Sequence, residues 1–65
     1  MIVKVNYLVT FKEGLKEAEF RNINMTACSI SDAKQHAKNE DILKSEPDKN
    51  KISSLSIISF KEKTN

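Results

Sequence analysis

The sequence predicts an α+β domain with the chain order ββαβ, in which one helix packs on one face of a three-stranded antiparallel sheet. Three observations lead to this prediction. The first eleven residues alternate between apolar and polar side chains, a helix-capping pattern stands near the middle, and another β-type segment lies near the end. Gly14 and Pro47 are the only glycine and proline, so few turns divide the chain.

The length allows a single domain, residues 1–65, with one small core. Such a core usually needs a disulfide, a metal or a partner for stability. One cysteine and one histidine are too few for an internal disulfide or a closed zinc site, so association is the expected supplement. The free thiol, the lack of a long apolar run and the lack of a signal-peptide pattern predict a cytoplasmic protein without membrane contact.

The two N-terminal strands are predicted from apolar alternation. Residues 2–12 form the first strand, because the odd-numbered positions from 3 to 11 are all apolar and mostly β-branched or aromatic. A tight reversal follows, in which Gly14 takes the left-handed conformation. The second strand is predicted over residues 15–27.

The pairing of these two strands contains a conflict. A register that opposes Tyr7 to Phe20 gives good apolar pairing near the turn, but further along it turns Ile23 away from the core face. One extra residue near Arg21–Asn22 would bring Ile23 opposite Val5. A β-bulge is therefore expected at that place.

A helix is predicted over residues 30–44. Ser29 is expected to cap it, with its hydroxyl accepting a hydrogen bond from the amide of Asp32, an acidic residue favoured in the first turn. Cys28 precedes the cap and is expected to pack against Ala33 as a small hydrophobic staple. The proline that follows forbids continuation of the helix.

The last strand is predicted over residues 52–61, with apolar side chains on both faces. Leu55 and Ile57 share one face, and Ile58 and Phe60 share the other, so the sequence leaves open which face meets the helix. The direction of each element then gives the sheet order 2-1-3, with the most regularly apolar strand in the centre.

The face of the sheet away from the helix is expected to be open and to carry aliphatic side chains. The third strand would also present an unpaired edge, which invites pairing with another strand. A protein partner and a homodimer are the expected consequences. The residues expected to bind the partner are Ile2, Leu8, Ile58 and Phe60.

No catalytic, metal or cofactor site is expected, and the chain is not expected to be an enzyme. Asp32, His36 and Glu40 recur at intervals of four and could share one helix face. Nothing beside them supplies a nucleophile, and a chain this short has little material for a cleft. A solvated polar face is the preferred interpretation.

Nucleic-acid binding is the alternative hypothesis. Its candidate residues are Lys34, Lys38, Lys49 and Lys51. The formal net charge is only +2, acidic residues interrupt the lysines, and the aromatic residues are expected on the core face. A mixed-charge surface is therefore the preferred interpretation of these lysines.

The pattern Met25-x-Ala27-x-Ser29-x-x-Asp32-Ala33-x-x-x-Ala37 resembles the strand-to-helix junction of small ββαβ proteins encoded by bacteriophages and mobile elements of low-GC Gram-positive bacteria. Some proteins from such gene neighbourhoods bind and inhibit host or defence proteins. The resemblance implies a fold and no functional residues. The leading hypothesis is thus a non-enzymatic protein-interaction module that modulates or inhibits a host or defence protein through its open sheet face or edge.

Overall fold

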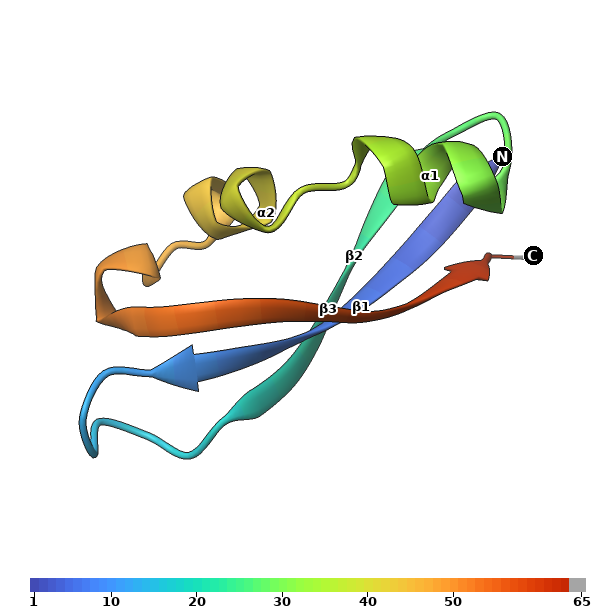
Figure 1. Ribbon diagram of the computed structural model, residues 1–65. Helices are drawn as coiled ribbons and strands as arrows, with labels where there is room; N and C mark the ends of the chain where they lie inside the picture. The colour runs from blue at the N-terminus through green and yellow to red at the C-terminus, as the bar shows by residue number, and fades with distance from the viewer. Residues whose placement is uncertain (64–65) are drawn as a thin grey trace.

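The computed structural model describes residues 1–63, in which three strands, two α-helices and one short 3₁₀ helix are found (Figure 1). The sheet is antiparallel with the order β2-β1-β3, and the helices lie on one face of it (Figure 1). The α+β class and the sheet order are therefore confirmed, whereas two helices replace the single predicted one. The elements are β1 (Ile2–Phe11), β2 (Glu19–Thr26), α1 (Ile30–His36), α2 (Asn39–Ser45), η1 (Lys49–Lys51) and β3 (Ile52–Glu62).

The pairing of β1 with β2 is regular along its whole length. Val5 lies opposite Ile23 as predicted, but Tyr7 lies opposite Arg21 and Phe20 lies opposite Leu8. The predicted bulge is therefore wrong. Because side chains alternate between the two faces of a strand, this shift of one residue moves Phe20 from the expected core face to the outer face.

The loop between β1 and β2 explains the difference in register. β2 begins at Glu19 and not at residue 15, so the connection is longer than the tight reversal expected from the sequence. The reversal itself is present: the amide of Leu15 donates to the carbonyl of Lys12 at 3.1 Å, and Gly14 has φ 63° as predicted. The extra residue that a bulge would have accommodated within β2 lies in this loop instead.

β3 carries two register shifts against β1, one between Asn6 and Tyr7 and one between Thr10 and Phe11. Each shift adds a residue that has no partner on β1, so core-facing positions recur at irregular intervals along β3. Phe60 therefore packs against the core, opposite Val5, and its predicted place on the outer face is wrong. The core-facing residues of this strand are Ile52, Leu55, Ile57 and Phe60.

The helical segment breaks at Ala37 and Lys38, which both have extended backbone angles. Ala33 and Ile42 are the buried residues of α1 and α2. In one continuous helix they would be nine residues apart, which at about 3.6 residues per turn places them on opposite faces. The break rotates α2 so that both side chains face the sheet.

The N-terminal cap of α1 forms as predicted, but the staple does not. The Ser29 hydroxyl accepts from the amide of Asp32 at 3.0 Å, and the Asp32 carboxylate accepts from the amide of Cys28 at 3.0 Å. The Cys28 side chain is exposed. Ala33 packs against Val3 and Ala27 instead, and a residue this small lets α1 approach the sheet closely.

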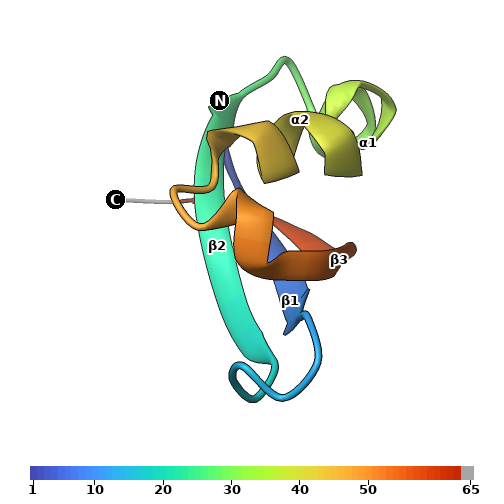
Figure 2. The same cartoon turned by 90° about the vertical axis from the view of Figure 1, so that its left-hand side faces the viewer.

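The core lies between the helices and the central strand. The inward side chains of β1 are almost completely buried, as the prediction of a central strand requires; they are Val3, Val5, Tyr7, Val9 and Phe11. Both helices pack toward β3, so the inner face of β2 receives less cover than the rest of the sheet (Figure 2).

Candidate functional site

A groove lies between β2 and the helices, on the part of the inner sheet face that the helices leave open. Its volume is about 240 Å³. Ile23 and Met25 of β2 are half-buried and line it together with buried Ile42 of α2. We call this feature the β2 groove; its lining residues are Ile23, Met25, His36, Ala37, Lys38, Asp41, Ile42 and Ser45.

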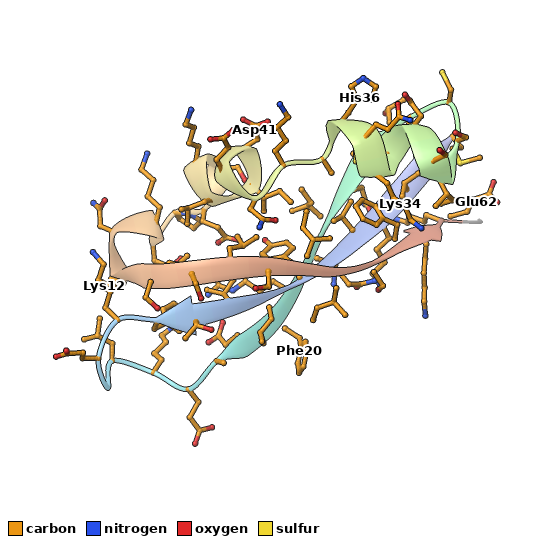
Figure 3. All side chains as sticks on the ribbon, in the orientation of Figure 1. Lys12, Phe20, Lys34, His36, Asp41 and Glu62 are labelled. Carbon is orange, nitrogen blue, oxygen red and sulfur yellow. The ribbon has the colours of Figure 1, made fainter. Side chains whose placement is uncertain are left out.

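The rim of the β2 groove is charged and its walls are apolar. Lys38 caps the start of α2, and Asp41 lies in the first turn of that helix. Figure 3 shows His36 and Asp41 on the side of the helices that faces away from the sheet, at the outer margin. Apolar walls with a few charged groups at the margin suit an apolar group that enters from solvent, such as a side chain or a small ligand.

Within residues 1–63, no strand lies beside the outer edge of β2, next to this groove. Met1 and Ala27 exchange two backbone hydrogen bonds, of 2.8 and 3.0 Å, so they form a hydrogen-bonded pair. Because such pairs alternate along an antiparallel ladder, every second residue of β2 directs its amide and carbonyl groups away from β1. These four residues are Phe20, Asn22, Asn24 and Thr26.

The outer face of the sheet is more polar than the sequence suggested. Asn22, Asn6 and Ser59 form a polar row across the three strands, and the Asn6 side chain donates to Ser59 at 3.1 Å. Of the candidate partner-binding residues, Ile2 and Ile58 are exposed. Ile58 lies beside Asn6 and Tyr7, away from Ile2 at the start of β1. Ile58 has no partner on β1, since it falls at one of the two register shifts.

Phe20 is the most exposed large apolar side chain of the described residues, at 79% exposure, and sequence reasoning placed it in the core. It projects from the sheet on the side opposite the helices (Figure 3). Leu8, one of the candidate residues, is half-buried directly opposite it. Phe20 and Leu8 thus form a small apolar patch on the outer face, at the β2 edge.

A buried acid ties the chain after α2 to the sheet. Glu46 is 8% exposed, and the Tyr7 hydroxyl donates to one of its carboxylate oxygens. Arg21 donates to the other at 2.5 Å, and also contacts Glu19 at 2.8 Å and Asp48 at 3.2 Å. The Arg21 guanidinium also lies 5.5 Å from the centre of a core aromatic ring, that of Phe11. We call Tyr7, Glu19, Arg21, Glu46 and Asp48 the Arg21 cluster.

The Arg21 cluster shifts the acid–base properties of its members. The hydrogen bond from Arg21 holds the pKa of both Glu19 and Asp48 below their ordinary values. Burial, followed by the hydrogen bond to Glu46, raises the pKa of the Tyr7 hydroxyl to about 12. Arg21 is the single cation of the cluster and faces three carboxylates, so the cluster keeps an excess of negative charge. Its contacts join β1, β2 and the chain after α2, which indicates a structural role.

Tyr7 is expected to make the fold sensitive to alkali. Because its pKa is higher in the folded state than the ordinary value of 10.0, the unfolded chain loses the proton first. This contribution to stability is present below pH 10 and is lost as the pH rises toward 12, at about 1.4 kcal/mol per pH unit. Urea unfolding at about pH 9 and about pH 11 should show a loss of about 1–2 kcal/mol.

The control for this prediction is Tyr7→Phe, which should lose that part of the alkaline dependence. Tyr7 is the single tyrosine and the chain has no tryptophan, so phenolate absorbance reports it directly. A phenolate transition of the folded protein near the ordinary value would contradict the prediction.

The residues considered for catalysis do not form a site. His36 contacts Asp32 at 3.0 Å and is exposed, and Glu40 lies beyond the helix break on α2. In the described part of the chain no three His, Cys, Asp or Glu side chains are grouped so as to hold a metal ion. The pair of Asp32 and His36 is therefore a contact between neighbouring side chains on the surface of α1.

The four lysines of the alternative hypothesis are spread over different elements. Lys34 lies on α1, Lys38 precedes α2, and Lys49 and Lys51 begin and end η1. All four are exposed. The aromatic residues do not accompany them, because Tyr7 and Phe11 are buried and exposed Phe20 projects from the opposite face. This arrangement lacks the combination of lysines with stacking aromatics that favours single-stranded nucleic acids.

Among residues 1–63, no helix is both long and apolar enough to span a membrane. Comparisons of the chain with protein-family models, with curated proteins and with solved structures gave no match. The β2 groove, the free β2 edge and the patch made by Phe20 and Leu8 adjoin one another and form the candidate site.

Proposed function

We propose that this chain is a non-enzymatic protein-interaction module, which binds a partner protein by adding an extended segment of that partner to the edge of β2. The observation that carries the proposal is the position of an apolar groove directly behind a free strand edge. A strand added there would gain hydrogen bonds from the backbone of β2 and would place alternate side chains over the groove.

The groove and the edge support different parts of this recognition. Backbone hydrogen bonds at Phe20, Asn22, Asn24 and Thr26 would give affinity with little dependence on partner sequence. Ile23, Met25 and Ile42 would select apolar side chains at alternate positions of the partner, because only apolar groups gain from burial there. The resemblance to mobile-element proteins adds the proposal that the partner is a host or defence protein, which binding would modulate or inhibit.

The proposal is tested by blocking the edge without disturbing the sheet. Asn24 directs its amide away from β1, so Asn24→Pro removes an outward donor and retains all β1–β2 hydrogen bonds. We expect proteins captured from a lysate by the wild type to be lost with Asn24→Pro and kept with the matched control Asn24→Val. Titration of each captured protein should then show at least tenfold weaker binding to the proline variant, which corresponds to about 1.4 kcal/mol. Equal binding by the two variants would contradict the proposal.

A further inference from the structure

The two free edges of the sheet differ in their ability to accept another strand. β3 has two register shifts, and such irregularities are a common means of preventing edge pairing. β2 has none: its eight residues pair regularly with β1. The run from Asn22 to Thr26 contains no charge and no proline, so this part of β2 lacks the usual protection of an edge strand; the charged residues of β2, Glu19 and Arg21, lie at its start.

We propose that the strand that β2 binds is the β2 strand of a second copy of this chain, paired antiparallel; this rests on the proposed function of the same edge. A two-fold axis perpendicular to the sheet places the inner faces of both copies, which carry the helices, on the same side of the joined sheet. Opposed residues must then both have even numbers or both have odd numbers. In one such register all four residues with free backbone groups pair on both copies, with Phe20 opposite the partner's Thr26 and Asn22 opposite the partner's Asn24.

In this register the side chains on opposite strands are also compatible with one another. Ile23 lies opposite the partner's Ile23 at the two-fold axis, on the inner face. Glu19 and Arg21 lie opposite the partner's Ala27 and Met25, so no like charges oppose each other. Phe20, exposed in the single chain, gains the partner's Thr26 as a cross-strand neighbour.

The dimer would have a six-stranded sheet with both helical layers on the same side. The two β2 grooves would then join into one trough, with Ile23 and Met25 of both copies along its floor. The interface is a single strand edge of about 27 Å, so the dimer should be weak and depend on concentration. One edge accepts one strand at a time, so a second copy and any other partner would compete for β2.

Disulfide trapping tests the proposed register. In a Cys28→Ser background, Ile23→Cys places the two thiols at the two-fold axis. The pair at this position is not hydrogen-bonded, so its Cα atoms are about 4.5 Å apart, which suits a disulfide. Met25→Cys is the matched control on the same face, since the two copies of residue 25 would lie about 14 Å apart. We expect a covalent dimer on mild oxidation for Ile23→Cys and none for Met25→Cys or Asn24→Cys.

Light scattering of the wild type provides a second measurement that needs no cysteine. Its mass should rise from monomer toward dimer with increasing concentration, and Asn24→Pro should remain a monomer. A wild-type monomer at millimolar concentration would overturn the dimer, and cross-linking through Asn24→Cys would overturn the register. If the wild type is a monomer but still loses captured partners on Asn24→Pro, the dimer fails while the proposed function stands.

Discussion

Replacing Arg21 with alanine is expected to lower the free energy of unfolding by about 3 kcal/mol. The change removes the cation from Glu46, whose side chain is only 7% exposed. Breaking a buried ion pair by removing one partner leaves the other charge without compensation, which is the costly case. Urea unfolding at neutral pH measures the loss, and a core of this size supplies little more than that in total.

The matched control is Lys16→Ala. Lys16 also lies over the Phe11 ring, at 4.9 Å, and pairs with Glu19 at 3.5 Å, but it does not contact Glu46. As an exposed ion pair it should contribute less than about 1 kcal/mol. A loss of similar size for the two variants would show that contact with Phe11, and not compensation of Glu46, is what Arg21 provides.

Replacing Tyr7, Arg21 and Glu46 together with apolar residues should cost less than replacing Arg21 alone. Buried charges replaced together by apolar groups of similar volume are often tolerated. The triple variant Tyr7→Phe, Arg21→Met, Glu46→Leu is therefore expected to recover most of the stability lost in Arg21→Ala.

The free energy of unfolding at low pH should depend on the same contacts of Arg21, those with Glu19 and Asp48. The folded-state pKa values of Glu19 and Asp48 lie below the ordinary 4.5 and 3.8. Their contribution is present above those ordinary values and is lost as the pH falls through the lowered ones. In Arg21→Ala this part of the acid dependence should shrink, because the group that lowers both pKa values has been removed.

Local patterns in the sequence predicted the parts of the fold that depend on local physics. The alternation from Val3 to Phe11 marks a strand buried on one face and paired on both sides, and it is the central strand. Ser29 and Asp32 lie at the spacing that a helix start requires, and the cap is formed by side chains within four residues. Gly14 has the positive φ that a turn in that place demands.

The wrong predictions concern how segments are placed relative to one another. The register of β1 and β2 depends on loop length, and residues 12–18 contain no signal that distinguishes a long loop from a short one. The two irregularities of β3 leave a trace in its sequence, since Ile52 and Leu55, like Ile57 and Phe60, are three residues apart where strict alternation requires two, but this spacing was not interpreted as a pair of bulges. The helix break was not predicted because the sequence does not show that Ile42, and not Leu43, faces the sheet; once Ala33 and Ile42 are both buried, one straight helix is excluded.

The candidate site was missed for the same reason. Its location depends on Phe20 and Ile23 being on opposite faces of β2, which the mistaken register reversed near the turn. Glu46 appeared to belong to a polar connection after the helix, and only the fold brings it to Tyr7 and Arg21. Sequence patterns identified β2 as a strand, but they could not show which of its residues lie on the inner face, beside the helices, and which lie on the outer face.

Replacing Ile42 with alanine is expected to cost about 2–5 kcal/mol, a loss as large as the expected stability of the whole domain. Ile42 is 4% exposed and is the only buried side chain that α2 contributes to the core. A helix of seven residues has little stability by itself, so its packing holds it in place. Urea unfolding and hydrogen exchange of the α2 amides would measure the effect.

The control Ile42→Val removes one methylene group and should cost about 0.5–1.5 kcal/mol while keeping α2 in place. Leu43→Ala tests the half-buried neighbour, which should cost less than Ile42→Ala because less of it leaves water on folding. Equal losses for Ile42→Ala and Leu43→Ala would show that α2 is held by general apolar contact and not by insertion of Ile42.

The effects of Ile42→Ala and Arg21→Ala, measured in a stabilising osmolyte so that the double variant stays folded, should not be additive, and this coupling connects the core to the candidate site. Glu46 is the C-terminal cap of α2, so a variant that releases the helix also releases the carboxylate from Tyr7 and Arg21. Once Glu46 has become solvated, losing Arg21 costs little, and the double variant should lose less than the sum of the two single losses. Ile42 also lines the β2 groove, so the Arg21 cluster would hold one wall of the binding surface in place through α2. Additive losses would mean that the cluster and the helix are independent, and that the groove keeps its shape without the ion pairs.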